Sequence, residues 1–186
     1  MKPETLIQWK VEDAAELYGV GNWGAGYFGI DEEGHVIARP QGPGGKVTIR
    51  LLDIVTGLKA RGMNMPVLLR FADILSAQIT LINESFAKAI AEAGYRGRYR
   101  GVYPIKVNQQ HLVVEDIVKF GRAYHHGLEA GSKAELVAAL AYMQDPEAFV
   151  VCNGYKDEEF VDLALNARKM GVRTVIVLEM ATEFAM

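Results

Sequence analysis

The chain has 186 residues, of which 50% are hydrophobic and 23% are charged, a balance typical of a globular domain in water. Its net charge of −3 excludes a general electrostatic attraction to nucleic acid or to anionic membranes. Cys152 is the only cysteine, which excludes an intrachain disulfide and favours a reducing, cytoplasmic location. No apolar run approaches the roughly 20 residues that span a bilayer, and we find no signal-peptide pattern.

The first third of the chain indicates a helix followed by β-structure. Apolar residues at near-helical spacing predict a helix over residues 5–18. The short apolar runs 27–30 and 35–38 flank a turn sequence and predict a β-hairpin. The glycine-rich stretch 41–45 lacks the lysine–serine pair of a phosphate-binding loop, so a plain turn is expected. We therefore assign residues 1–63 to an N-terminal helix and a β-rich segment that belongs to a second, β-type domain.

The remaining residues, 64–186, alternate between strand and helix patterns. Strands are predicted over residues 65–71, 99–107, 127–129, 148–152 and 173–178. Helices are predicted over residues 72–93, 110–121, 132–143 and 157–170. Such alternation indicates parallel strands joined by helical crossovers, so the fold class is α/β.

Polar residues recur where these strands end. They are Lys106, Glu129, Asn153 and Glu179. In an α/β barrel the active site gathers at the carboxyl ends of the strands, which this pattern would serve. An open, doubly wound sheet would give the same local pattern. Because fewer than eight strands are present, we expect the first half of a TIM-type (β/α)8 barrel and a longer parent protein.

Lys106 is the strongest candidate for chemistry. It follows an apolar, β-favouring run, where a partly desolvated amine loses its proton easily and becomes a nucleophile toward carbonyls. Position alone favours an ordinary exposed lysine at a strand end, and the residues that follow weaken that interpretation. Glu129 ends the next strand and could orient the amine. Ser132 and Glu135 have the spacing of a helix capping box, and Glu135 could in addition lie near Lys106.

Other polar residues allow simpler interpretations. Asn153 could touch a cofactor or merely bond the backbone of its turn, and the sequence does not choose between these. Cys152 ends an apolar run and is expected to be a buried core residue. His125 and His126 precede their strand, so they should lie at the opposite end of the barrel from the site.

Three stretches of the sequence together resemble a known family. They are Tyr-Pro-Ile-Lys-Val-Asn-Gln-Gln at 103–110, Gly-Leu-Glu-Ala-Gly-Ser-Lys-Ala-Glu-Leu at 127–136, and the N-terminal signature over 15–28. The chain resembles the alanine racemase-type decarboxylases that use pyridoxal phosphate (PLP), and within them the biosynthetic arginine decarboxylases. The resemblance covers nearly the whole chain.

The resemblance implies specific roles. Lys106 would bind PLP covalently, and Glu129 and Glu135 match acidic positions near that lysine, while Asn153 remains a candidate contact from its strand-end position. The implied reaction converts L-arginine to agmatine and CO₂ in polyamine (putrescine and spermidine) biosynthesis. The family also implies magnesium and a homo-oligomer. Its other cofactor contacts come from later regions, so we expect these 186 residues alone to be inactive.

Three alternatives stay open. Another decarboxylase of the same fold, acting on ornithine, lysine or diaminopimelate, would share the lysine motif. A non-catalytic PLP-binding barrel would also share it, although the β-rich residues 19–45 argue against a single barrel. The chain could also be an inactive piece that associates through open sheet edges.

Overall fold

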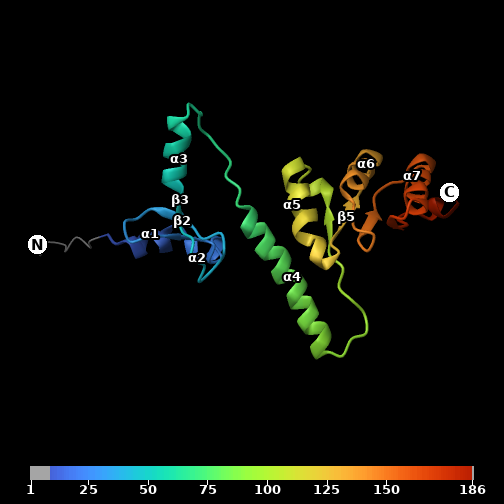
Figure 1. Cartoon of the computed structure of the whole chain (residues 1–186), viewed down its shortest axis with the longest axis horizontal. Coiled ribbons are helices and arrows are strands. Elements are labelled where there is room, and N and C mark those ends of the chain that lie inside the picture. Colours follow the sequence, from blue (N-terminus) through green and yellow to red (C-terminus); the bar gives the residue numbers. More distant parts are fainter. Residues whose placement is uncertain (1–8, 186) are drawn as a thin grey trace, which may run out of the picture. The chain divides into compact units, whose positions relative to one another are not determined.

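The computed structural model describes residues 9–185 and divides the chain into two compact units. Unit 1 is Met1–Ala77 and unit 2 is Gln78–Met186. The boundary falls inside the long helix α4, Ala72–Glu92, which is labelled in Figure 1. Each unit has its own sheet.

Unit 1 combines short helices with a three-stranded antiparallel sheet in the order β1-β2-β3. Its elements are α1 (Val11–Leu17), α2 (Val20–Trp23), β1 (Phe28–Ile30), β2 (Val36–Ala38), β3 (Ile49–Arg50) and α3 (Leu51–Ala60). The predicted hairpin is confirmed, because Phe28 pairs with Ala38 and Ile30 with Val36. The predicted helix over 5–18 is seen as α1, and its residues 5–8 lie outside the described part of the chain.

Asp31 organises the hairpin turn. Its Oδ1 accepts hydrogen bonds from the backbone N–H groups of Glu33 and His35, at 3.0 and 2.9 Å. Arg50 reaches back from β3 and places its Nε 2.7 Å from Asp31 Oδ2. The His35 backbone bond and the Arg50 charge outweigh burial and lower the pKa of Asp31. One carboxylate thus fixes both the turn and the third strand.

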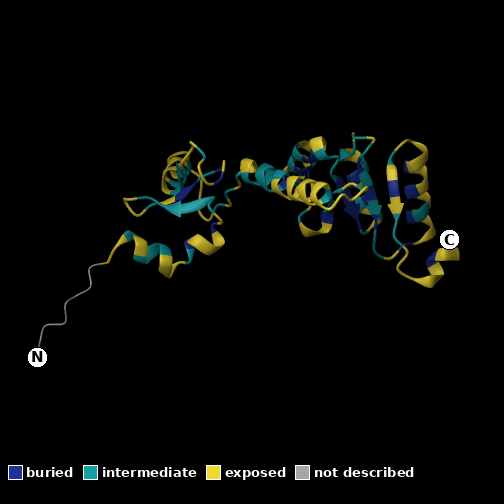
Figure 2. Cartoon of the chain, turned by 90° about the horizontal axis from the view of Figure 1, so that it is seen from below, coloured by how far each residue is buried: buried dark blue, intermediate teal, exposed yellow. Residues whose placement is uncertain are grey.

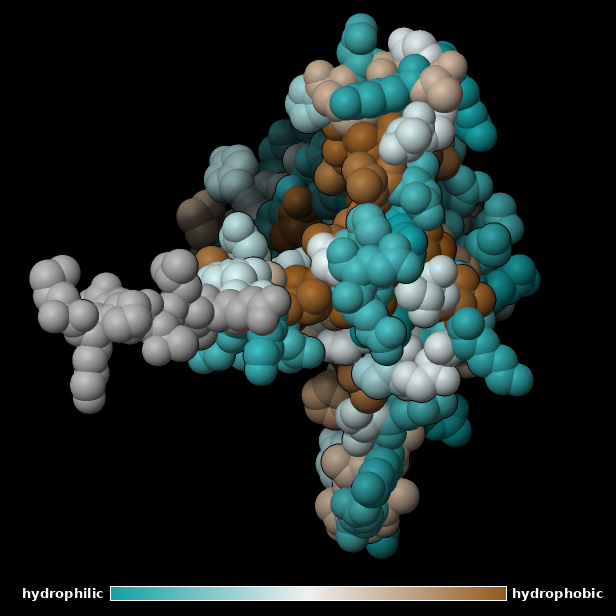
Figure 3. Space-filling model, turned by 90° about the vertical axis from the view of Figure 1, so that its left-hand side faces the viewer, coloured by the Kyte–Doolittle hydropathy of each residue, from teal (hydrophilic) through white to brown (hydrophobic). Residues whose placement is uncertain are grey.

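Unit 1 also exposes several large apolar side chains. Figure 3 colours the surface by hydropathy and shows brown atoms between teal ones; tryptophan and tyrosine lie near the white middle of that scale. The exposed apolar residues of α1, α2 and their neighbours are Trp9, Leu17, Tyr18 and Trp23. Apolar surface of this kind is typical of a face that other protein segments cover.

Unit 2 contains a four-stranded parallel sheet in the order β4-β5-β6-β7. After α4, its elements are β4 (Val102–Pro104), the 3₁₀ turn η1 (Ile105–Val107), α5 (His111–Gly121), η2 (Arg122–Tyr124), β5 (Gly127–Ala130), α6 (Lys133–Tyr142), β6 (Phe149–Cys152), α7 (Glu158–Lys169), β7 (Arg173–Ile176) and η3 (Ala181–Ala185). The predicted alternation of strands and helices from residue 99 onward is confirmed.

The core of unit 2 lies between this sheet and its helices. Side chains from β5 and β6 pack against α5, α6 and α7, and the fully buried members include Leu128, Val150 and Phe160. Figure 2 shows dark blue and teal in the strands of this sheet, whereas the outer faces of the helices are yellow. Burying one side chain such as Phe160 contributes about 2–3 kcal/mol of hydrophobic free energy. The helix-covered face of the sheet therefore holds the unit together.

Two strand predictions are wrong in part. Residues 65–71 are not a strand, because an apolar run forms one only when a neighbour pairs with it, and none does so among the described residues. The strand expected over 99–107 is limited to β4, since η1 turns the chain after Pro104. In the stretch 46–63, for which no element was predicted, the structure forms β3 and α3.

Candidate functional site

The register of the parallel sheet brings the predicted site residues to one end. Pro104, Glu129 and Val151 lie side by side on adjacent strands. Since side chains alternate along a strand, Glu129 faces away from the helix-packed residues Leu128 and Ala130. An open cavity of about 340 Å³ lies on this face, and it is lined by Val102, Pro104, Lys106, Glu129, Val151 and Asn153.

Lys106 lies at the rim of this cavity. The sequence predicted that Lys106 ends the strand, but the residue lies in the η1 turn, one residue beyond Ile105. Its side chain is exposed, so the expected desolvation of the amine is not found within the described residues. No ion pair joins Lys106 to Glu129 in the described part of the chain. The amine is therefore accessible to a molecule in the cavity.

Glu129 is the most unusual group in the cavity. The residue is only 7% exposed, and neither carboxylate oxygen has a hydrogen-bond partner among the described residues. A buried carboxylate without a donor is costly, because it loses its water without replacement. The chemistry of this position fits a ligand that brings a cation or an N–H group.

Glu135 ties together the turns around the cavity. Ser132 caps α6 as predicted, its Oγ accepting from the Glu135 backbone N–H at 3.2 Å. The Glu135 carboxylate accepts from the Gly131 backbone N–H at 2.7 Å and from Gln109 Nε2 at 2.9 Å. The second bond reaches the segment that follows Lys106. Glu135 thus holds the turns in place, and no contact between it and Lys106 is found in the described part of the chain.

The structure places Asn153 where either of the alternatives left open by the sequence remains a prediction. Its backbone N–H donates to the Ala130 carbonyl at 2.9 Å, which fixes the turn after β6. Its side chain lines the cavity beside Glu129 and Lys106. Glu179 takes a different role, because its Oε1 accepts from the Gly154 backbone N–H at 2.8 Å.

The two histidines lie at the opposite end of the sheet, as predicted from their place before β5. His125 has φ 54° and its Nδ1 lies 2.9 Å from Asp145 Oδ2. His126 is packed against Gly101 and Gly121, and burial lowers the pKa of its ring. A second cavity of about 300 Å³ lies here beside His126 and Asp145, far along the strands from Lys106. This end has no part in the cavity of Lys106.

Cys152 is a core residue, as predicted. It is fully buried among the helix-facing side chains, and this burial raises the pKa of its thiol to about 11. Among residues 9–185 no group of three or more histidine, cysteine or acidic side chains could hold a metal ion. Within the same residues no helix has both the length and the apolar character needed to cross a membrane.

Sequence reasoning missed Lys156 and Glu183, which form a buried ion pair beside the Asn153 turn. Lys156 follows Asn153-Gly154-Tyr155, which looks like an exposed turn. The only hint is that a polar residue, Glu183, follows the last strand as other polar residues follow theirs.

Residues 77–185 match the family described as pyridoxal-dependent decarboxylase, pyridoxal binding domain. The chain belongs to this family. The matched residues are those of unit 2 almost residue for residue, and they contain Lys106, Glu129, Glu135 and Asn153. The predicted resemblance to PLP-dependent decarboxylases is therefore confirmed.

Named relatives narrow the similarity within the pyridoxal-dependent decarboxylases. The chain is 48% identical over 174 residues to the biosynthetic arginine decarboxylase of Gloeobacter violaceus, and this match covers 94% of the chain and 27% of the relative. It is 46% identical to that of Thermosynechococcus vestitus, covering 95% of the chain and 28% of the relative. The chain thus spans about a quarter of the length of the curated relatives that it matches.

A solved structure agrees. The biosynthetic arginine decarboxylase SpeA from Campylobacter jejuni matches with a TM-score of 0.82 and 38% identity, over 90% of this chain and 28% of that one. The predicted fold class, α/β with part of a PLP-binding barrel, is confirmed by this match and by the family. The residues of the cavity fit the cofactor, because an accessible amine and an unpartnered carboxylate stand where a ligand would complete them.

Proposed function

We propose that the full-length protein is a PLP-dependent decarboxylase that converts L-arginine to agmatine and CO₂ in polyamine biosynthesis. The proposal rests chiefly on one observation: an exposed lysine and a buried, unpartnered carboxylate share one cavity at the carboxyl ends of parallel strands. Its choice of arginine is supported by the names of the relatives, biosynthetic arginine decarboxylases.

In this proposal Lys106 supplies the covalent attachment. Its exposed amine is the nucleophile that the cavity offers to an aldehyde. When bound, PLP would accept the electron pair that is left as CO₂ departs. Lys106 is also placed to return a proton to the product after the carboxylate has left.

Glu129 would hold positive charge in the site. Its carboxylate oxygens have no donor among the described residues and are free to accept from an N–H group of the ligand or from Lys106. Glu135 would keep the turn of Gly131 and the segment of Gln109 in register. Asn153 would contribute its amide to the cofactor from the wall of the cavity.

The proposal extends to the parent protein. We infer a homo-oligomer with a cytoplasmic location, with no nucleic-acid or membrane partner, in keeping with the composition. We also propose that residues 1–63 belong to a β-domain and that residues 64–186 are the first part of the PLP-binding barrel. Magnesium, which the family resemblance implies, stays a proposal for the full-length protein; among residues 9–185 no group of three or more histidine, cysteine or acidic side chains could hold the ion.

Borohydride reduction of the full-length protein with PLP, followed by peptide mass mapping, tests the attachment. We expect a pyridoxyl adduct on Lys106, and an adduct only on another lysine would overturn the assignment. Lys133 is the comparison, because it is half-buried and its amine is bound to Asp157 and Glu159.

Substrate choice is tested with the same protein. We expect release of CO₂ and agmatine from L-arginine, and much slower turnover of ornithine, lysine and diaminopimelate. Preferred turnover of one of these three would support the alternative decarboxylases. Labelling of Lys106 without turnover of any of them would favour the non-catalytic barrel.

A further inference from the structure

Lys156 is one of the largest fully buried side chains in the described part of the chain, and it carries an ionisable amine. It lies in the turn between β6 and α7 with 0% exposure, and Glu183 in η3 has a side-chain exposure of 0%. Burying an ion pair rarely adds stability over a pair of apolar side chains of similar size. We therefore look for a role of this ion pair other than stabilising the core.

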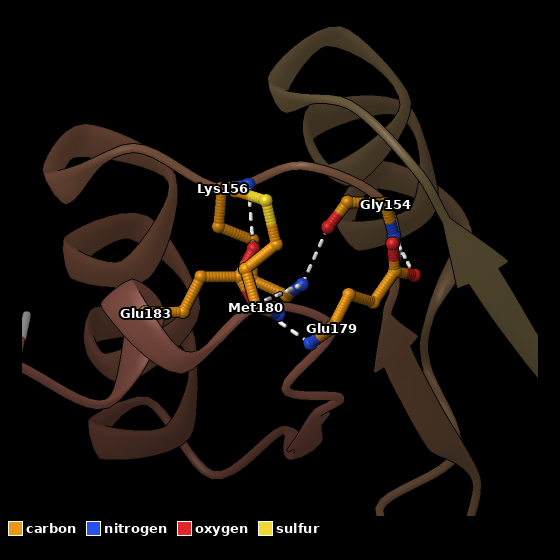
Figure 4. A network of polar contacts seen from close by, with 5 residues as sticks. All are labelled: Gly154, Lys156, Glu179, Met180 and Glu183. Atoms are coloured by element: carbon orange, nitrogen blue, oxygen red, sulfur yellow. Dashed lines mark hydrogen bonds and ion pairs between the residues drawn. The ribbon is translucent and has the colours of Figure 1, made fainter.

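The pair is fully bonded. Lys156 Nζ donates to the Gly154 carbonyl at 2.5 Å and lies 3.4 Å from Glu183 Oε2. The Glu183 carboxylate also accepts backbone N–H bonds from Glu179 at 2.8 Å, Lys156 at 3.2 Å and Met180 at 3.4 Å. These bonds, led by that of Glu179, lower the pKa of Glu183 from its ordinary 4.5. Figure 4 shows the five residues meeting between two loops.

Gly154 is held from both sides by this network. Its carbonyl accepts from Lys156, and its N–H donates to Glu179 Oε1 at 2.8 Å. Its φ of 75° lies in the left-handed region, which favours glycine. A Cβ at this position would lie only 2.7 Å from the Gly131 carbonyl oxygen. The turn after β6 is thus pressed against the turn after β5.

From Gly131 the contacts continue to the cavity. The Gly131 N–H is bound by Glu135, and Gly131 lies two residues beyond Glu129. On the other side, Asn153 precedes Gly154 and bonds to the Ala130 carbonyl. A continuous set of contacts therefore leads from the buried pair to two walls of the cavity, while neither Lys156 nor Glu183 lines it.

We propose that Lys156 and Glu183 are positioning residues. They set the conformations of the turns at Asn153 and Gly131, and so shape the site for the pyridine ring of the cofactor and for the substrate. The proposal rests on the proposed function for its ligand, but the positioning itself is a property of the protein without ligand. Charged hydrogen bonds suit this task, because they are directional and fix a unique loop arrangement where an apolar contact would allow several.

The test uses the full-length protein and the variant Lys156→Met, which is unbranched and one atom shorter and removes the charge. We expect the dissociation constant for PLP to rise ~10-fold, the size typical of losing a group that orients a ligand-binding residue. In the cofactor-free protein, amide hydrogen exchange should become faster in peptides 150–157 and also in peptides 128–136.

The matched control is Arg173→Met. Arg173 forms an ion pair with Glu147 at 2.5 Å, which joins the starts of β6 and β7 at the opposite end of the same two strands. We expect it to change neither PLP affinity nor exchange in peptides 128–136. If Lys156→Met matches Arg173→Met in both measurements, the pair has no positioning role and the proposal is overturned.

A second variant keeps the test decisive if Lys156→Met does not fold. Lys156→Met leaves the Glu183 charge buried, so Lys156→Met/Glu183→Met removes both charges at once. The double variant should fold and still show weakened PLP binding and faster exchange in peptides 128–136; unchanged values would contradict the proposal. Absence of PLP labelling on Lys106 in the parent protein would instead defeat the proposed function, while the exchange data would still decide the positioning role.

Discussion

The two ends of the parallel sheet differ in how their charged side chains are paired. At the amino ends of the strands, Asp145 binds His125 and Glu147 binds Arg173. At the carboxyl ends, Glu129 is buried with no partner among the described residues, and Lys106 is exposed beside it. The acidic groups named at the amino ends are therefore paired, although the buried His126 Nδ1 there has no partner among the described residues, whereas the Glu129 carboxylate at the other end is left free to accept from a ligand.

The same contrast separates the two kinds of buried charge at the carboxyl ends. The Lys156–Glu183 pair is satisfied and lies behind the cavity, while the Glu129 carboxylate is unsatisfied and lies within it. Groups that position a site need full bonding to hold one arrangement, and groups that bind a ligand need free bonding capacity. Burial alone would not have told them apart.

The largest expected effect is at Lys106. Lys106→Ala in the full-length protein should lower arginine decarboxylation by roughly 10³-fold or more, because no nucleophile would remain for the cofactor. Activity assays and the absorbance of bound cofactor measure this. Lys133→Ala serves as the control at a half-buried, ion-paired lysine, and its activity should be unchanged. Nearly full activity in Lys106→Ala would contradict the proposal that the carboxyl end of the sheet holds the catalytic site.

Glu129→Gln should separate activity from stability. We expect activity to fall ~100-fold if the carboxylate holds charge on the ligand, a typical loss for one electrostatic group. The thermal stability of the cofactor-free protein should stay level or rise by ~1 kcal/mol, because an unpartnered buried charge is removed. Melting curves and steady-state rates report the two quantities. A large loss of stability would mean that Glu129 is a structural residue.

Asp145→Asn at the opposite end should lower stability and leave activity unchanged. Burial favours the neutral acid, but the Glu147 backbone bond and the His125 ring outweigh it and lower the pKa of Asp145 from 3.8. The charged form therefore stabilises the fold above pH 3.8, and this stability is lost as the pH falls through the lowered folded value. We expect a loss of ~1 kcal/mol at pH 7, fading in acid, with activity unchanged. Urea unfolding at several pH values tests it.

The smallest effect is expected at Cys152, which ends β6 on the helix-packed face of the sheet. Since burial raises the pKa of the thiol to about 11, above its ordinary 9.0, it should resist alkylation at pH 8 until the protein unfolds. Ionisation opposes folding here, so stability should decline only as the pH rises above 9.0. Mass measurement after iodoacetamide treatment checks this, with rapid native labelling as the contrary result.

The sequence predicted the sheet from β4 to β7 well because each strand has an apolar run, and β4, β5 and β6 are each followed by a helix. Ser132 is an example, since it caps α6 by accepting from the N–H of Glu135, three residues on; the Glu135 carboxylate binds the Gly131 N–H instead of the Ser132 N–H that a full capping box would use. The strand over 65–71 failed because pairing depends on a neighbour that local pattern cannot reveal. Lys156 was missed for the same reason, as its burial depends on Glu183, far along the chain.

The placement of His126 has a consequence for how this region can evolve. A Cβ at Gly101 would lie 2.3 Å from the ring, and one at Gly121 would lie 2.4 Å from the His126 Cβ. The three positions therefore share one fixed volume. We expect them to change together in related sequences, so that a larger residue at 101 or 121 is accompanied by a smaller one at 126. Such compensating exchange would show that packing limits which residues can occupy these three positions.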